Sequence, residues 1–410
     1  MPAATPIPRR PSVLTLYSAA DLLTGPGCPV CRYVTEASDR YLTWFALEGS
    51  SQPATITRLC ASLGMCPRHT RGLMSQPGAA PRLTAVNRYL VQAARDQLAG
   101  RAAGRAGCPA CAHDDDAAGR AMDTLLDGLS EGSVRERYRE LGGLCVPHVR
   151  DAAAWPGHRL AGWLAETVLA AVTESALPSP RWLAGTDHDA EARAVLRDAS
   201  TAATRCGAGG CAACLAAARS ERADLAALLR ISGEGQPGHR QVLCAAHVGD
   251  LAVLAGRDGL RPLLAWQAGC LLAASRRRPD RRRGWLRLRR GPAGSPGECA
   301  VCLRRADAAG QAIDELRTRL RASQPPPGGS APLCVRHLLT MRSTDPWAGQ
   351  VTAPGAVQRA DRLIAELGEA FRKGTWAGRK EARGHEMTAW RRAAAFLDGG
   401  VFCGRPPWDT

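Results

Sequence analysis

The chain has 410 residues and a formal net charge of +16, with 45% hydrophobic and only 5% aromatic residues. This length and hydrophobic content are those of a folded protein with a sizeable core made mainly of Ala, Leu and Val. No apolar run approaches the ~18 residues of a membrane span, and Met1–Arg10 has no apolar stretch behind it that would make a signal peptide. We therefore expect a soluble, cytoplasmic protein.

The first half of the chain, residues 20–175 after a tail at 1–19, holds two cysteine pairs of the form CxxC and two Cys–His pairs of the form CxxH. In chain order these are CPVC (Cys28, Cys31), CPRH (Cys66, His69), CPAC (Cys108, Cys111) and CVPH (Cys145, His148). Apolar stripes with helical spacing, such as Leu83 to Leu98 and Leu160 to Val172, lie between or after the motifs.

A linker and a helix are expected at 176–205. The third repeat, at 206–275, and the fourth, at 298–372, follow the same pattern. Their motifs are CAAC (Cys211, Cys214), CAAH (Cys244, His247), CAVC (Cys299, Cys302) and CVRH (Cys334, His337). Helical stripes run from Leu303 to Leu320 and from Leu363 to Phe371. Residues 373–410 should form a last helix, with Trp390 and Phe396 as packing anchors, and a loose tail.

An Arg-rich linker at 276–297 separates the third repeat from the fourth. Residues 276–290 hold nine arginines and one aspartate, half of the net charge. The chain has only two lysines, so part of its basic excess reflects a general preference for arginine.

Each CxxC is followed, after 29 to 34 residues, by a CxxH in strict alternation, which makes the ligand set the unit of an internal repeat. Three thiolates and one imidazole are a tetrahedral zinc set, and soft sulfur selects zinc over calcium or magnesium. We expect each CxxC to close on the CxxH that follows it, giving four Cys3His sites and about four Zn²⁺ per chain. Each site would carry a net charge of −1, which Arg32, Arg68 and Arg336 could offset.

Other chemistries for these motifs are weaker. Redox CxxC pairs belong to strand–helix units that the sequence does not show, and haem attachment needs a histidine directly after the second cysteine. An iron–sulfur cluster stays open. Of the other cysteines, Cys270 reads as a core residue, whereas Cys60 and Cys206 are minor candidates for ligands. The acidic run Asp114 to Asp116 reads as capping of a first helical turn.

The sequence predicts an all-α fold of repeated helical hairpins, each clamped by zinc at its open end. The thiolates of each CxxC should lie in the first turn of a helix, where the helix dipole favours negative charge. The four modules could stack continuously or pair into two lobes of two modules each.

These repeated motifs, together with KEARGHEMTAWRRAAAFLDG near the C-terminus, resemble a family of uncharacterised bacterial proteins with repeated CPxC and CPxH elements. The resemblance spans most of the chain and implies metal binding, without an activity. Repeats three and four depart from it, because Ala212, Ala245, Ala300 and Val335 stand where proline is usual.

Two functions stay open. The first is a non-catalytic, zinc-stabilised helical scaffold or adaptor that binds another protein. The second is a nucleic-acid-binding protein that uses the basic segment for phosphate contacts and its tryptophan for stacking. The residues of this second hypothesis are Arg276, Arg277, Arg278, Arg281, Arg282, Arg283, Trp285, Arg287, Arg289 and Arg290. A redox or metal-dependent enzyme is the weakest alternative, since the sequence has no recognised catalytic motif in a suitable context.

Overall fold

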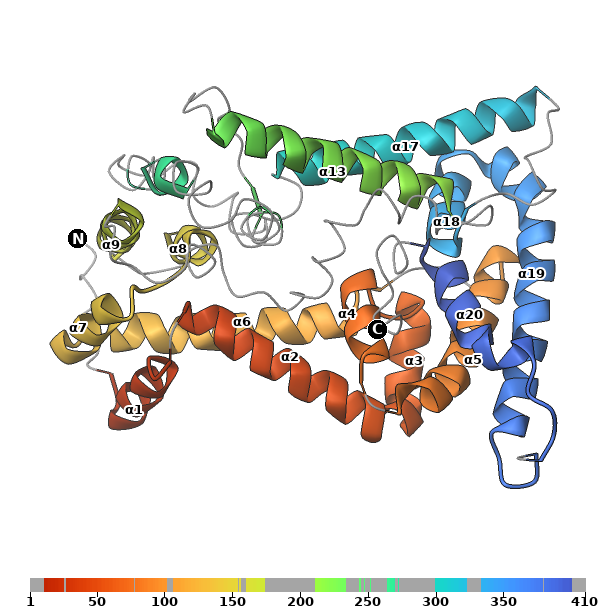
Figure 1. Ribbon diagram of the computed structural model, residues 1–410, viewed down its shortest axis with the longest axis horizontal. Coiled ribbons are helices and arrows are strands. Elements are labelled where there is room, and N and C mark those ends of the chain that lie inside the picture. The colour runs from red at the N-terminus through yellow and green to blue at the C-terminus, as the bar shows by residue number, and fades with distance from the viewer. Residues whose placement is uncertain are drawn as a thin grey trace, which may run out of the picture. The chain divides into compact units, whose positions relative to one another are not determined.

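In the residues that the computed structural model describes, all regular secondary structure is helical and there is no strand (Figure 1). These residues are 11–25, 27–76, 78–101, 106–153, 155, 160–173, 211–233, 243–244, 247, 251, 264–269, 272, 299–322, 333–378 and 380–399. The all-α prediction is confirmed. The linker at 176–205 and the Arg-rich segment at 276–297 lie outside the described residues, and the predicted segment boundaries stay a prediction. No described helix is both long and apolar enough to cross a membrane.

The helices of the first half follow one another closely. They are α1 (Val13–Leu22), α2 (Pro29–Leu47), η1 (Gly49–Ser51), α3 (Pro53–Ser62), α4 (Pro67–Met74), α5 (Ala79–Leu98), α6 (Pro109–Gly128), α7 (Gly132–Glu140), α8 (Val146–Ala153) and α9 (Ala161–Thr173). The later elements are α13 (Ala212–Gly233), α17 (Ala300–Arg321), α18 (Val335–Thr344), α19 (Pro346–Lys373), η2 (His385–Thr388) and α20 (Ala389–Leu397). Proline begins α2, α3, α4, α6 and α19, where its missing N–H costs no hydrogen bond and its fixed φ suits the first helical position.

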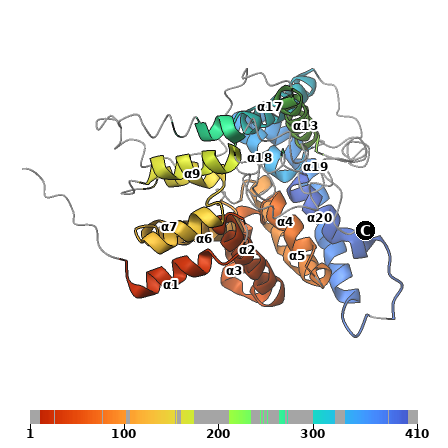
Figure 2. The ribbon, with the colours of Figure 1, turned by 60° about the vertical axis from the view of Figure 1, so that its left-hand side comes forward.

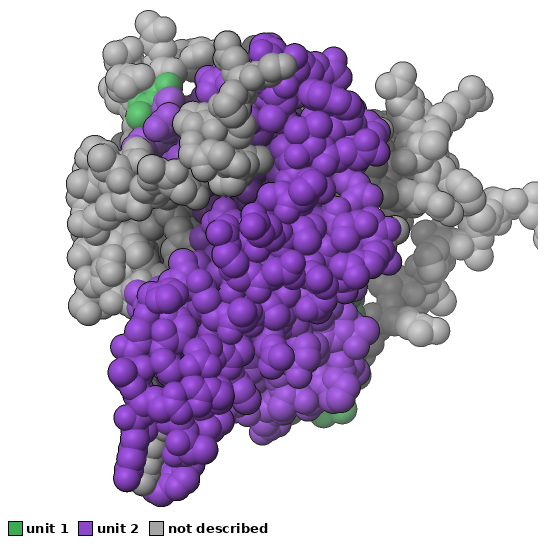
Figure 3. Space-filling view, turned by 90° about the vertical axis from the view of Figure 1, so that its right-hand side faces the viewer, with its two compact units in different colours: residues 1–37, 115–188, 225–300 green, residues 38–114, 189–224, 301–410 purple. Residues whose placement is uncertain are grey.

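The chain forms two compact units, and each takes residues from both halves of the sequence (Figure 3). The first comprises residues 1–37, 115–188 and 225–300, and the second comprises 38–114, 189–224 and 301–410. The units are therefore not successive stretches of chain, unlike the two lobes considered above.

The second unit is built around α5, which packs against α3, α4, α18, α19 and α20 (Figures 1 and 2). The expected stripe on α5 is its buried face, with Leu83, Val86, Leu90 and Leu98 all at most 4% exposed. The side-chain amide of Asn87 donates a 2.9 Å hydrogen bond to the backbone oxygen of Trp390 and so ties α5 to α20.

The two aromatic anchors expected on the last helix are buried, Trp390 at 7% and Phe396 at 1% exposure. Two large side chains of the predicted stripes are exposed. Leu303 on α17 is 48% exposed and Phe371 near the end of α19 is 50% exposed. Both lie at the ends of their stripes, where the described neighbouring elements leave part of the side chain uncovered.

In the first unit, α1 packs on α7 and α8 packs on α9. Tyr138 of α7 is fully buried, and its ring lies 5.3 Å from that of Trp163 on α9. Its hydroxyl accepts a 2.8 Å hydrogen bond from the backbone N–H of Leu144, directly before the CVPH motif. This bond fixes the turn that leads into α8.

Candidate metal centres

The sixteen motif residues come together as four groups of three cysteines and one histidine, and within each group all ligand atoms lie within 4.8 Å of one another. The groups are site A (Cys28, Cys31, Cys145, His148), site B (Cys66, His69, Cys108, Cys111), site C (Cys211, Cys214, Cys334, His337) and site D (Cys244, His247, Cys299, Cys302). Four Cys3His sets were expected, and the structure has four.

The partners within these sets differ from those expected. No CxxC closes on the CxxH that follows it. In each half of the chain, the first CxxC joins the second CxxH, and the first CxxH joins the second CxxC. Each site is therefore assembled from two neighbouring repeats. The prediction that the CxxC and CxxH of one repeat share a metal and clamp one hairpin is wrong.

Helix length explains the exchange of partners. The helix α2 starts directly after Cys28, and its 19 residues carry the chain about 28 Å away from site A. The next long segment, α3, has only 10 residues and spans about 15 Å, too short to bring Cys66 back to its starting point. The CxxH therefore meets the next CxxC, at the start of α6.

The spacing of the ligand atoms suits a tetrahedral metal. Bonds of 2.3 Å at tetrahedral angles place two sulfurs about 3.8 Å apart. The Sγ atoms of Cys31 and Cys145 are 3.7 Å apart, and those of Cys214 and Cys334 are 3.9 Å apart. Disulfide-bonded sulfurs would lie about 2.05 Å apart.

Each histidine presents Nδ1 to the thiols. In site A, Nδ1 of His148 lies 3.4, 3.3 and 3.2 Å from the sulfurs of Cys28, Cys31 and Cys145. Sites B, C and D repeat this arrangement, with Nδ1 to Sγ distances of 3.2 to 3.6 Å. In this common geometry, Nδ1 of each ring points toward the thiols and Nε2 lies on the other side of the ring.

Helix N-termini converge on the thiols. The first cysteine of each CxxC lies directly before the helices α2, α6, α13 and α17, and Cys66 and Cys334 are the N-cap residues of α4 and α18. The positive ends of two helix dipoles thus meet at sites B and C and favour the negative charge of three thiolates. The expected place of the CxxC thiols at helix starts is confirmed.

Site A lies against a glycine turn and a buried tyrosine. Gly143 has φ +80°, and a Cβ at this position would lie 2.5 Å from the ring of Tyr138. Only glycine therefore lets the backbone pass this ring and bring Cys145 to site A. Burial, together with the nearby Cys28 and Cys145, raises the pKa of Tyr138, so its hydroxyl keeps its proton.

Site B has a carboxylate behind its histidine. The Nε2–H of His69 donates a 2.9 Å hydrogen bond to Oδ2 of Asp114, which also accepts a 2.6 Å bond from Arg68 and a 3.5 Å bond from Ser38. A carboxylate in this position fixes the tautomer and ring orientation of a ligating histidine and raises its basicity.

The electrostatics of site B show how strongly it attracts a cation. Burial opposes protonation of His69, but Asp114 and the thiolates of Cys108 and Cys66 outweigh it and raise the pKa of His69 to about 11. Burial alone would raise the pKa of Asp114, but His69 and Arg68 outweigh it and lower the pKa of this carboxyl below its usual value. A zinc ion would take the place of this proton.

The interpretation of Asp114 as a first-turn cap is wrong. Asp114 lies in the second turn of α6, a helix that has no acidic residue in its first turn. The position of Asp114, three residues after Cys111, could be read from the sequence. Its partner His69 could not, because that contact depends on the exchanged pairing.

Site C is covered by the C-terminal segment. A Cβ on Gly399 would lie 2.7 Å from Cβ of Cys211 and 3.3 Å from Sγ of Cys214, so the backbone here lies directly on the cluster. Burial lowers the pKa of Arg359, and the thiolates of Cys334 and Cys211 partly offset this effect. A guanidinium is thus close enough to compensate the charge of site C.

Most ligands of site D are buried, with His247 at 2% and Cys299 at 1% exposure. The guanidinium of Arg150 on α8 donates a 2.9 Å hydrogen bond to the backbone oxygen of Leu243, the residue before Cys244. This bond connects α8, which carries the site A ligand His148, to the chain that enters site D.

The three arginines expected to offset the site charges bind other groups. Arg32 donates to the backbone oxygen of Leu22, Arg68 pairs with Asp114, and Arg336 pairs with Asp398 at 2.7 Å. Each of the three thus contacts a group outside the ligand sets.

The remaining candidates divide into two kinds. Cys60 on α3 is half-buried, and burial raises the pKa of its thiol; it belongs to none of the four groups. Cys206, Cys270, Cys403 and all ten residues of the nucleic-acid hypothesis, from Arg276 to Arg290, lie outside the described residues.

Comparison with models of protein families, with curated proteins and with solved structures returned no match. The resemblance to bacterial proteins with repeated CPxC and CPxH elements therefore has no family match behind it. The four Cys3His groups are consistent with repeated metal-binding modules, and the assignment below rests on their geometry.

Proposed function

We propose that the protein is a non-catalytic helical scaffold or adaptor whose architecture is held by four structural Zn²⁺ ions. The observation that carries the proposal is the closed ligand set. Every site offers four protein ligands whose donor atoms lie within 4.8 Å of one another, whereas catalytic zinc keeps a position for water or substrate.

The sites also join parts of the chain that are far apart in sequence, as structural metals do. Cys28 and His148 of site A are 120 residues apart, and Cys211 and His337 of site C are 126 residues apart. Closing such long loops removes much conformational freedom from the unfolded chain, so the binding energy of zinc becomes folding energy.

An exposed apolar helix face supports the proposal that the protein binds a protein partner. On α1, Val13, Leu14 and Tyr17 are 69%, 78% and 73% exposed and lie within one turn of each other. Soluble proteins rarely leave such side chains grouped unless something binds them. The nucleic-acid alternative rests on the sequence of 276–290 alone and stays a prediction.

Elemental analysis of the purified protein tests the metal assignment directly. We expect close to four zinc and no iron per chain. EDTA treatment under reducing conditions should remove the zinc together with most of the far-ultraviolet circular dichroism of the helices, and added Zn²⁺ should restore both. Zinc near zero in protein that keeps its helices would refute the proposal, and iron with visible absorbance would replace zinc by a cluster.

A further inference from the structure

Site B differs from sites A and C in the exposure of its thiols. All three of its cysteines, Cys66, Cys108 and Cys111, are half-buried. Every cysteine of sites A and C is buried, and site D has one half-buried cysteine, Cys302. Site B is the only one of the four groups in which all three cysteine residues are partly exposed.

The histidine of site B, in contrast, is buried and bonded to a carboxylate. His69 is 2% exposed, and its ring is fixed between the thiols at Nδ1 and Asp114 at Nε2. Asp114 is itself held by Arg68. One ligand is therefore anchored in the interior, whereas the three cysteine residues are partly exposed.

The partial exposure of these cysteines matters because zinc leaves a closed site by ligand exchange. An incoming donor must approach the metal or a bound thiolate before a protein ligand can dissociate. At site C, the backbone of Gly399 against Cys211 blocks such an approach.

We propose that site B is the exchangeable zinc site of the protein and the site whose ligand thiolates are modified first, while sites A, C and D release their zinc slowly. This inference rests on the proposed zinc assignment. The reactants are small chelating ligands and small electrophiles. In exchange, donor atoms of the chelator replace the thiolates on zinc with no change of oxidation state. In alkylation by iodoacetamide, a thiolate forms an S–C bond and iodide leaves with the electron pair.

Two measurements on the full-length, zinc-loaded protein test the inference. In the first, the chelating dye 4-(2-pyridylazo)resorcinol is added and the zinc complex is followed by absorbance. We expect about one quarter of the zinc to leave in a separate phase at least about tenfold faster than the rest. In the second, brief iodoacetamide treatment followed by peptide mass spectrometry should label Cys66, Cys108 and Cys111 before any other ligand cysteine.

A variant of the anchoring carboxylate sharpens the first measurement. Asp114→Asn keeps the shape but removes the charge behind His69, and outer-shell changes of this kind cost about 10- to 100-fold in metal affinity. The fast phase should accelerate by about tenfold or more, with the slow phases unchanged. The matched control is Asp398→Asn, which removes the aspartate beside Arg336 near site C and should leave the fast phase as it is.

The outcomes separate this inference from the assignment on which it rests. About four zinc per chain released in one phase, or first alkylation of ligands at site A, C or D, would overturn the exchangeable site and leave the scaffold proposal standing. Protein without zinc would remove the scaffold proposal instead. The wild-type measurements decide the matter even if the Asp114 variant does not fold.

Discussion

The carboxylate of Asp224 on α13 pairs with the guanidinium of Arg304 on α17 at 2.7 Å. Asp224 lies ten residues after Cys214, and Arg304 lies two residues after Cys302. The pair therefore fixes the register between the two long helices that begin at sites C and D.

In the first half of the chain, the residues at the same two positions are also in contact, but through aromatic rings in place of charges. Tyr41 lies ten residues after Cys31, and His113 lies two residues after Cys111. Their rings stack with centroids 4.8 Å apart. A stacked aromatic pair and an ion pair thus occupy equivalent positions between helices that begin at paired metal sites.

A second pair of contacts repeats the relationship one turn away. Glu221 pairs with Arg305 at 3.4 Å, and Ser38 donates to Asp114 at 3.5 Å. In both cases the residues lie seven and three positions after the second cysteine of their motifs. The repeating structural element is therefore a pair of CxxC helices with exchanged CxxH partners.

A double-mutant cycle on Asp224 and Arg304 tests this register. The side chains are 17% and 40% exposed, so solvent screening limits the pair to about 0.2–1 kcal/mol. Asp224→Asn and Arg304→Gln should each lower the free energy of unfolding by an amount in this range, with a non-additive double variant. Additive losses would mean that the two side chains do not interact.

The exchanged ligand pairing predicts the effect of removing one ligand. Cys145→Ser should abolish site A, lower the zinc content from four to three per chain, and leave Cys28 and Cys31 open to alkylation. The rate at which Cys108 and Cys111 are alkylated should stay as in the wild type. Peptide mass spectrometry after iodoacetamide treatment reads both pairs in one experiment.

The opposite pattern would restore the simpler pairing of each CxxC with its following CxxH. In that case Cys145→Ser would expose Cys108 and Cys111. Cys60→Ser is the matched control, because Cys60 belongs to none of the four groups. It should keep all four zinc ions and the protection of every ligand cysteine.

The ligands and the helical class could be predicted from the sequence because spacing determines both. CxxC and CxxH fix which atoms can share a metal locally, and the apolar stripe on α5 fixes its buried face. Which CxxC meets which CxxH depends instead on where long helices deliver the chain. The hydrogen bond from His69 to Asp114 could not be predicted for the same reason.

The turn before α8 should tolerate no side chain at Gly143. Alanine there would have to adopt φ +80° with its Cβ only 2.5 Å from the Tyr138 ring. We expect Gly143→Ala to lower the free energy of unfolding by about 1–3 kcal/mol and to weaken zinc binding at site A. Denaturant unfolding and zinc analysis measure the two effects.

Gly132→Ala is the matched control for this prediction. Gly132 begins α7, and a Cβ there would meet nothing within 4 Å. Because alanine favours a helix more than glycine does, this variant should be neutral or slightly stabilising. Equal losses from both variants would show that the close approach to Tyr138 is unimportant.

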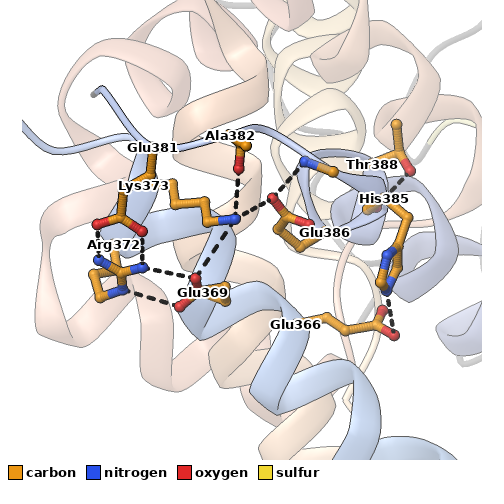
Figure 4. A network of polar contacts seen from close by, with 10 residues as sticks. Glu366, Glu369, Arg372, Lys373, Glu381, Ala382, His385, Glu386 and Thr388 are labelled. Carbon is orange, nitrogen blue, oxygen red and sulfur yellow. Dashed lines mark hydrogen bonds and ion pairs between the residues drawn. The ribbon is translucent and has the colours of Figure 1, made fainter. Parts of the chain in front are cut away.

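The end of α19 is closed by a network of charges that depends on pH (Figure 4). Glu386 accepts a 2.7 Å hydrogen bond from the backbone N–H of Gly384 and a 3.0 Å bond from Lys373. These bonds lower the pKa of Glu386 to about 2. Lys373 also donates to the backbone oxygen of Ala382, which holds the segment after α19 against the helix.

A carboxyl whose pKa is lower in the folded protein stabilises it above the unfolded value, about 4.3, and loses that contribution as the pH falls toward 2. The difference in unfolding free energy between wild type and Glu386→Gln should therefore be constant from pH 8 to 6 and begin to shrink below about pH 5. Zinc content must be followed at every pH, because protons also compete for the thiolates. A difference that grows on acidification, in protein that keeps its zinc, would contradict the lowered pKa.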